Sequence, residues 1–482
     1  MLPSRLLRFS AALAFLHSAQ ASTNPFTQYA VDFPDPNRVA AGNLPKNLAG
    51  AEDTIVAWAD EMNSYGPWSV TFKQVLAPSG DKHDYMSWAP YHWPNCTGIP
   101  NSASFTPPEI WEKCPYITRD GEANPDRILI NDFQSFFNLS DAVLYNSIAA
   151  VLQGTPSSSY SQNVAKFIDT WFLNNDTFMN PNLNYAQMDR GPTGQMGTFT
   201  GPLDLRGMAK IASGILMLRK TKNSDWTEAR NAQFVAWCNK YIGWLQTAPQ
   251  AKSAAAQLNN HGTIFVSQLA ALKLVVGDTN GAVSLIQGYF SGIFKGQINS
   301  NGEQVPKRSD PHTPIPLSEF NAGGMITNAR LLSYADPTLT PSGWNATTQQ
   351  GATIQKAMDF LMTVNPATSQ ETNVTIEIYP NIAAVASAYG DASGKYGTFL
   401  NKSGFPYAND ATFLWDQPLA GGDLAAESEA NHTGSAAGST SGVPAPTQSA
   451  TNKTKNGSLS RFGRLELGSW AAGVLGVIGL LY

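Results

Sequence analysis

The chain has few cysteines, histidines and charged residues, and each shortage narrows its possible functions. Its 482 residues include three cysteines and six histidines, and the histidines form no H-x-x-H or H-E-x-x-H pattern. A zinc enzyme is therefore disfavoured, and we expect neither a metal nor another cofactor. Charged residues make up 14% of the chain and the formal net charge is -5, without the basic excess of nucleic-acid-binding proteins. We expect no nucleic-acid partner.

Apolar and aromatic residues are plentiful, at 42% and 11%, so a large core can form. The two ends differ from the rest. Residues 1–21 combine basic residues, an apolar stretch and an A-x-A ending, which is the pattern of a signal peptide. Residues 421–456 are rich in Ser, Thr, Gly and Pro and predict an unfolded stalk. Residues 457–482 place an apolar tail after a polar spacer.

That last pattern indicates a GPI-attachment propeptide. A membrane-spanning anchor is the alternative, although the apolar tail is short for a bilayer span. We therefore expect a secreted glycoprotein on the cell surface, held at the membrane through a lipid anchor. N-x-[ST] sequons predict glycans at Asn95, Asn138, Asn175, Asn345, Asn373 and Asn401, with further sequons in the stalk.

Residues 22–420 are expected to form one large all-α domain. Apolar residues recur three and four positions apart in eight segments, which predicts helices in antiparallel pairs and favours an α/α toroid. Asp141 and Asp225 are interpreted as helix starts, and Gly154 and Gly277 as helix ends. We expect a monomer. The segments are 141–154, 163–175, 203–220, 225–248, 262–278, 281–294, 322–336 and 354–364.

Cys96 and Cys114 flank a Pro- and Asn-rich loop, which they could close as a disulfide in an oxidising compartment. Cys238 lies in a helical apolar stretch, where an inert buried thiol is the better interpretation.

A polar and aromatic segment, "PSGDKHDYMSWAPYHWPNC" (78–96), is broken by prolines and predicts a loop. Aromatic faces beside cations suit sugar rings that carry carboxylates, because the face stacks on C–H groups while a cation binds the anion. The alternative is a rim loop whose aromatics only pack on the toroid. Its candidate substrate-binding residues are Lys82, His83, Asp84, Tyr85, Tyr91, His92 and Trp93.

The stretch "LNNHGT" (258–263) stands in front of an apolar helical run. One asparagine can cap that helix, yet two amides accompany the histidine. Removal of the proton next to a uronic-acid carboxylate requires a donor on the carboxylate and a base that titrates near neutrality. Asn260 and His261 are a donor and a base of this kind. A purely structural histidine at a helix start is the alternative.

The segment 185–208 joins two helices through glycines and contains two arginines. Arg190 has the right charge for an anionic polymer and is a candidate substrate-binding residue. Arg206 is interpreted as an ion-pair partner within the next helix.

The motifs "GDKHDYMSWAPYHWP", "PYITRDGEANPD" and "NNHG" together resemble the alginate lyase family, the family-5-like polysaccharide lyases and their fungal relatives, over roughly residues 51–365. The resemblance implies an incomplete α/α toroid and metal-free β-elimination of 1,4-linked uronate polymers. It also implies that Asn260 neutralises the substrate carboxylate and that His261 is the base. Lys82, His83 and Tyr85 would line the cleft.

One region departs from the family pattern. The family has an Arg and then a Tyr acid before an S-x-F-N segment, whereas here "SEFN" (318–321) follows Leu317, and Arg308 is the best equivalent of the Arg. Leucine cannot transfer a proton. Tyr85, Tyr91, His312 or water is left as the proton donor.

Three functions therefore remain. The first is a polysaccharide lyase that acts on an anionic alginate-like or glucuronan-like polymer, with Asn260, His261 and Arg308 as catalytic residues. The second is a carbohydrate-binding protein that keeps the fold with weakened turnover, which Leu317 motivates. The third is a glycoside hydrolase on an α/α toroid, although no pair of carboxylates is singled out by spacing.

Overall fold

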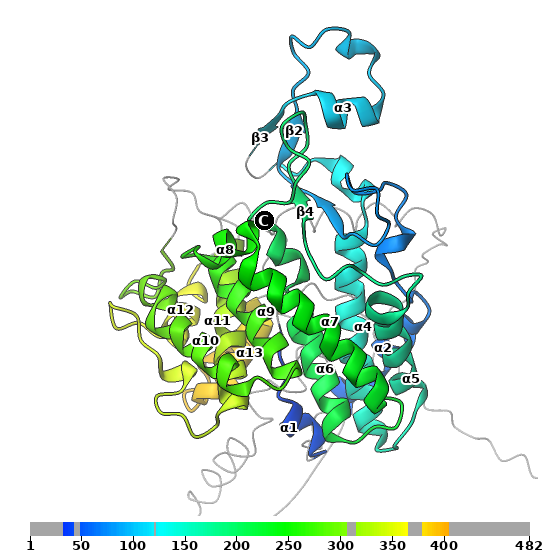
Figure 1. Ribbon diagram of the computed structural model, residues 1–482. Helices are drawn as coiled ribbons and strands as arrows, with labels where there is room; N and C mark the ends of the chain where they lie inside the picture. The colour runs from blue at the N-terminus through cyan, green and yellow to red at the C-terminus, as the bar shows by residue number, and fades with distance from the viewer. Residues whose placement is uncertain (1–31, 43–48, 120–121, 306–314, 365–377, 404–482) are drawn as a thin grey trace, which may run out of the picture.

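The computed structural model describes residues 32–42, 49–119, 122–305, 315–364 and 378–403. This part of the chain is all-α apart from four short strands (Figure 1). The helices are α1 (Pro36–Ala40), α2 (Ala49–Asn63), α3 (Pro107–Lys113), α4 (Asp132–Gln153), α5 (Ser159–Ile168), α6 (Met208–Lys220), α7 (Glu228–Thr247), α8 (Pro249–Ala255), α9 (Asn260–Val275), α10 (Thr279–Ser291), α11 (Ile315–Ala335), α12 (Ile354–Leu361), α13 (Ile378–Tyr389) and α14 (Lys395–Lys402). The strands are β1 (Met86–Trp88), β2 (His92–Pro94), β3 (Tyr116–Thr118) and β4 (Tyr185–Met188).

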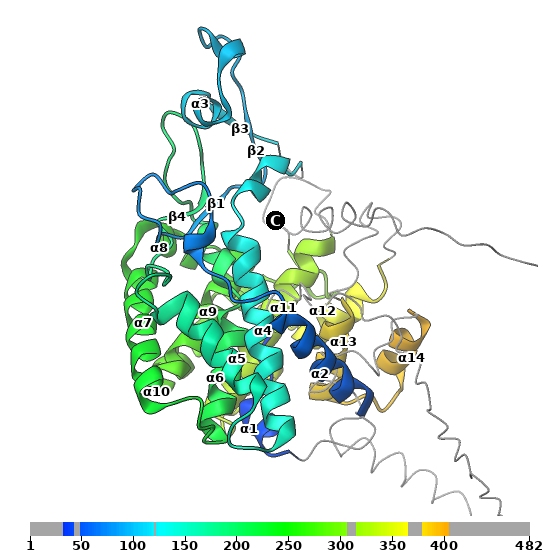
Figure 2. The same ribbon diagram turned by 90° about the vertical axis from the view of Figure 1, so that its right-hand side faces the viewer.

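The long helices pack side by side as an incomplete α/α toroid, as the sequence predicts (Figures 1 and 2). Helix α4 packs against α2, α5 and α6, and α9 packs against α6, α10 and α11. Both α4 and α9 are buried along most of their length, because other helices cover them on several sides. Helix α9 is therefore an inner element of the helical body.

Two expected helix starts are wrong. Helix α4 begins at Asp132, and Asp141 lies inside it as the buried partner of Lys210, with 2.7 Å between Nζ and Oδ1. Burial raises the pKa of Asp141 to about 6. At the start of α7 the cap is Thr227, whose side chain accepts from the N–H of Arg230. An aspartate beside apolar residues can be a helix cap or a buried ion-pair partner, and the sequence alone does not distinguish the two.

Helix ends were predicted more accurately. Gly154 ends α4 with φ 65°, and Gly277 follows α9 with φ 83°. This left-handed backbone favours glycine over residues with a side chain.

The segment expected to be a loop contains β1 and β2. Strand β1 pairs in parallel with β4, and β2 pairs antiparallel with β3. Strands β2 and β3, with α3 between them, form an arm (residues 91–119) that projects from the helical body (Figures 1 and 2). The disulfide between Cys96 and Cys114 closes the arm, as expected from the sequence.

The sequons differ in accessibility. Asn95, Asn175, Asn345 and Asn401 are exposed, whereas Asn138 is half-buried inside α4. Asn373 lies outside the described residues, as do the expected signal peptide, stalk and anchor propeptide. Cys238 is a buried free thiol. No helix in the described ranges has both the length and the hydropathy to cross a membrane.

Candidate active site

The Asn-His pair lies at the first turn of α9. Asn259 is the N-cap, and its side-chain oxygen accepts a hydrogen bond from the backbone N–H of His261 at 3.1 Å. Asn260 is the first helical residue, is 9% exposed, and has no hydrogen bond from its amide to a described residue. One asparagine therefore builds the helix start, and the amide of the other is available to a ligand.

Gly262 brings this turn unusually close to the preceding loop. A Cβ atom there would lie 2.0 Å from the carbonyl oxygen of Gln257, so no larger residue fits. The amide of Gln297 donates to the Thr263 hydroxyl at 2.8 Å and to the carbonyl of Leu258 at 3.3 Å. The turn that carries the imidazole is thus fixed from two sides.

The His261 side chain is half-buried, and its Nδ1 is enclosed with no hydrogen-bond partner among the described residues. The ring of Phe199 packs against it with 5.3 Å between centroids. Burial lowers the pKa of His261 to about 4. The positive end of the α9 dipole disfavours an imidazolium in the same direction. The imidazole is therefore neutral at ordinary pH and able to accept a proton.

Helix α11 supports α9 through buried polar contacts. The Ser267 hydroxyl donates to the Asn328 side-chain oxygen at 2.9 Å, and the Asn328 amide donates to the carbonyl of Thr263 at 3.1 Å. A Cβ at Gly324 would lie 2.9 Å from Cγ2 of Thr263, so the two helices approach closely there. The close approach of α9 and α11 depends on the absence of a side chain at Gly324 and on the hydrogen bonds of Asn328.

Asn321 is a further candidate site residue, to which the sequence analysis assigned no role. Its amide donates to the side-chain oxygen of Gln304 at 2.8 Å, and its own oxygen is buried with no partner in the described ranges. Its position in the "SEFN" segment, which matches the family pattern, is the sequence feature that could have identified it. Arg308 and His312 lie outside the described residues. Leu317 lies in the first turn of α11, and its side chain is likewise not described.

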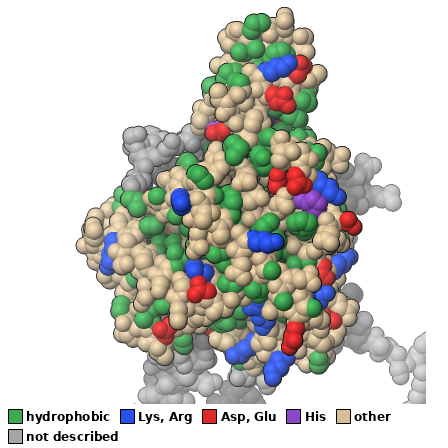
Figure 3. Space-filling view, viewed as in Figure 1, with side chains coloured by type: hydrophobic (Ala, Val, Ile, Leu, Met, Phe, Trp, Pro, Cys, Tyr) green, Lys and Arg blue, Asp and Glu red, His purple; other side chains and the backbone are tan. Residues whose placement is uncertain are grey.

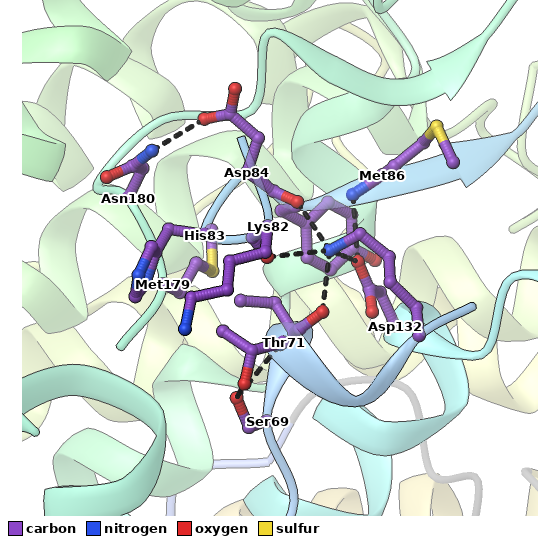
Figure 4. Close-up of polar contacts among 12 residues, drawn as sticks. Ser69, Thr71, Lys82, His83, Asp84, Met86, Asp132, Met179 and Asn180 are labelled. Carbon is purple, nitrogen blue, oxygen red and sulfur yellow. Dashed lines mark hydrogen bonds and ion pairs between the residues drawn. The ribbon is translucent and has the colours of Figure 1, made fainter. Parts of the chain in front are cut away.

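Lys73 is buried against the first half of the aromatic segment, from which Lys82, His83, Asp84 and Met86 are labelled in Figure 4. Lys73 donates to the carbonyls of Val70 at 2.6 Å and Asp84 at 2.7 Å, and its Nζ lies 3.1 Å from Oδ2 of Asp132. Asp132 also accepts from the N–H of Met86. Burial raises the pKa of the Asp132 carboxyl to about 7, and Lys73 opposes that shift. Through these hydrogen bonds, the Lys73–Asp132 pair holds the backbone of residues 84–86 at the start of β1.

Two candidate substrate-binding residues, Asp84 and Tyr85, are internal instead. Tyr85 is fully buried, and its hydroxyl donates to Asp204 at 3.1 Å. Asp84 is 7% exposed, and it accepts from the Ser79 hydroxyl and the Asn180 amide (Figure 4). Because both side chains already have protein partners, they support the segment and do not face a substrate.

Lys82 and His83 lie nearer the surface. Lys82 is exposed, and only its carbonyl accepts from Lys73, at 3.3 Å. His83 is half-buried, stacks on Phe178, and its Nδ1 lies 2.6 Å from the Phe178 carbonyl. Both remain candidate binding residues.

The second half of the segment forms the root of the arm. Tyr91, His92 and Trp93 are half-buried. The Nδ1 of His92 lies 2.6 Å from Asp189, and Trp93 donates to the carbonyl of Glu122 at 2.8 Å. His92 thus ties β2 to the residue that follows β4, and Trp93 ties it to the chain that follows β3.

Arg190 is not a surface cation. It is 3% exposed and donates two hydrogen bonds to Asp126, at 2.6 and 3.1 Å. Its guanidinium lies 4.1 Å from the ring centroid of Trp88 and 4.3 Å from that of Tyr116. The expected substrate contact is therefore replaced by a structural clamp. Arg206 is also buried, but it packs over aromatic rings such as Phe137, at 4.1 Å.

Asp204 is a buried carboxylate that sequence reasoning did not place. It accepts hydrogen bonds from Tyr85, from the Ser87 hydroxyl, and from the Gln187 amide at 2.8 Å. Burial raises its pKa to about 6, and the three hydrogen bonds oppose the shift. Gln187 has φ 44°, a strained backbone for a residue with a side chain. Such strain is often found at functional sites.

Comparison with known proteins identifies the family of the chain. The family model described as alginate lyase matches residues 69–371. The chain belongs to the alginate lyase family. Among solved structures, it is similar to an alginate lyase from Bacteroides ovatus, with a TM-score of 0.67 and 26% sequence identity over 80% of this chain and 97% of that one. A comparison with curated proteins finds no significant match. As a member of the alginate lyase family, the chain is a polysaccharide lyase.

Proposed function

We propose that this lyase cleaves 1,4-linked uronic-acid polymers by β-elimination at the first turn of α9. The observation that carries the proposal is that the Asn260 amide, which has no hydrogen-bond partner among the described residues, is adjacent in sequence to the neutral imidazole of His261. Asn260 donates to the substrate carboxylate and stabilises the charge that develops on its oxygens. His261 takes the proton from the carbon beside that carboxylate.

The Nδ1 of His261 is enclosed, so Nε2 is assigned as the nitrogen that accepts the proton. The carbanion then expels the glycosidic oxygen, the C4–O bond breaks, and a C4–C5 double bond forms. The leaving oxygen gains a proton. Tyr85 is an unsuitable donor because it is buried against Asp204, so Tyr91, His312 or water is assigned this step. Arg308 is proposed to add a cation at the carboxylate.

A panel of alginate, polyglucuronate and related uronans, followed by ultraviolet absorbance of the new double bond, tests the function. His261→Ala should abolish the signal, and Lys252→Ala, an exposed change in α8, should leave it intact. Thermal unfolding of each variant shows whether the fold is retained. Full activity in a folded His261→Ala variant would contradict the assigned base. Binding of a uronan without product, in wild type and variant alike, would favour the carbohydrate-binding alternative.

We also propose that the protein is secreted and lipid-anchored at the cell surface. The support is the sequence pattern of residues 1–21 and 457–482. Treating intact cells with a phosphatidylinositol-specific phospholipase should release the protein into the medium. Retention after that treatment, with release by detergent alone, would indicate a membrane-spanning tail.

A further inference from the structure

A cavity lies where the arm joins the helical body. Its volume is about 260 Å³, and the chain contributes to it on both sides of the arm, through Pro90 before β2 and through Arg127 and Ile128 after β3. Helix α4 and strands β1 and β4 supply other walls. The lining residues are Ser87, Trp88, Pro90, Arg127, Ile128, Ile130, Asn131, Phe133, Gln134, Gln187 and Asp204.

The polar wall of this cavity centres on a carboxylate. A carboxylate has about four lone-pair sites, and Asp204 uses three of them for Tyr85, Ser87 and Gln187. One acceptor site remains for a ligand donor. A sugar hydroxyl can donate to it, whereas an ionised ligand carboxylate has no donor and would be repelled by the like charge.

The remaining walls are largely apolar. Trp88, Pro90, Ile128, Ile130 and Phe133 surround a space that is small for a drug-sized ligand, as a site for a single sugar ring would be. Apolar walls with a few hydrogen-bonding groups suit the C–H faces and hydroxyls of a pyranose ring. Basic and acidic side chains are interspersed on the face of the molecule shown in Figure 3. The charged residues among those that line the cavity are one of each sign, Arg127 and Asp204. The cavity therefore lacks the strongly cationic character that a row of uronates would favour.

The cavity and His261 lie at one end of the helical body. Helix α8, which directly precedes the start of α9, lies near β4 at the end from which the arm projects (Figures 1 and 2). Phe199 packs on His261, and Asp204 lines the cavity five residues later. Five residues span at most about 18 Å, so one oligosaccharide can reach both places.

We propose that this cavity binds a neutral sugar unit of the polymer, some units away from the cleaved linkage. The natural substrate would then be a uronate polymer that also contains neutral sugar units, cleaved at its 1,4-linked uronic acids. The statement about the natural substrate rests on the proposed lyase function, whereas the statement about the neutral sugar does not. The binding of a neutral sugar can be tested without turnover.

A matched pair of residues tests whether the cavity takes part in binding. Ile128 and Leu129 are adjacent in one 3-10 helix and are 51% and 52% exposed, but only Ile128 lines the cavity. Ile128→Ser should weaken binding of a mixed neutral and uronic oligosaccharide about fivefold. Leu129→Ser should change it less than about twofold. Equal effects from the two substitutions would overturn the proposal.

The charge of the bound unit is tested at Asn131, which is exposed and lines the cavity. For a neutral sugar, Asn131→Asp and Asn131→Lys should each change affinity by less than about twofold, with little dependence on salt. Opposite shifts in the two variants, with Asn131→Lys binding more tightly and both shifts reduced by salt, would show that the unit is a uronate.

Calorimetric titration of the full-length His261→Ala variant with cellotetraose, a neutral β-1,4 tetrasaccharide, and with tetraglucuronate at pH 8 separates this inference from the function. Cellotetraose should bind, and Ile128→Ser should weaken it. If cellotetraose binds in this way but wild type cleaves no uronan, the cavity assignment stands and the proposed function fails. If wild type cleaves uronans but cellotetraose does not bind, the neutral-sugar site is wrong.

Discussion

The side-chain oxygen of Asn259 accepts a hydrogen bond from the backbone N–H of His261, the residue assigned as the base, and this bond caps the start of α9. Asn259→Ala should lower the free energy of unfolding by about 1 kcal/mol, because an N-cap is lost. It should also reduce kcat, because the first turn of α9 is no longer fixed. Urea unfolding and steady-state kinetics measure the two effects.

The control is Asn259→Ser, because serine also caps helices. It should retain most of the stability and activity. If the alanine and serine variants behave alike in both measurements, the cap does not position His261.

The acid limb of the pH–rate profile should reflect the buried His261. Its pKa is lowered to about 4, so the imidazole stays neutral until the pH falls through that value. The kcat/KM should therefore hold its value as the pH is lowered through 6.5, the ordinary histidine value, and decline only near 4. A limb at pH 6.5 would show that His261 is solvated in the free enzyme, or that another group is the base.

The same shift has a consequence for stability. Between pH 6.5 and 4 the unfolded chain binds a proton at His261 that the folded chain does not, so wild type loses stability as the pH falls through this window. His261→Gln removes this contribution. The stability difference between variant and wild type should change across the window and level off outside it, as urea unfolding at several pH values will show.

Arg190 should behave as a structural residue. Arg190→Lys removes the bidentate pair with Asp126 and should cost about 2 kcal/mol, since Asp126 is partly exposed. Asp126→Asn should cost a similar amount, and the double variant should cost less than the sum. A rise in KM for a uronan in Arg190→Lys but not in Asp126→Asn would instead indicate a substrate contact.

The buried Lys73–Asp132 pair should be required for folding of the segment before β1. Lys73→Met leaves the Asp132 carboxyl buried without its cation and should cost about 3 kcal/mol. Adding Asp132→Asn removes the buried charge and should recover part of that loss. Denaturant unfolding of both variants measures the recovery, and no recovery would mean that the carbonyl contacts of Lys73 dominate.

Local patterns were sufficient for much of the fold. The three- and four-residue apolar spacing predicted most helices, because burial of one helical face imposes that spacing. Gly154 and Gly277 marked helix ends because the left-handed backbone favours glycine. The pairing of Cys96 with Cys114 was inferred from their flanking positions, since a disulfide joins cysteines whose backbones lie close together.

Sequence reasoning failed where a polar side chain has a distant partner. Asp141 was assigned as a cap and Arg190 as a substrate contact, yet each pairs with a residue more than 60 positions away, Lys210 and Asp126 respectively. Residue type alone does not reveal whether a charge faces solvent or a partner.

By itself, the sequence determined the helical class and the family, and it singled out the Asn-His pair as the candidate site, because these depend on residue type and short spacing. Only the tertiary structure decided which of the two asparagines caps α9, that Tyr85 points inward at Asp204, and that a cavity forms at the root of the arm. Those outcomes depend on segments far apart in the chain meeting in space, and the burial and hydrogen bonding that result set what each side chain can do.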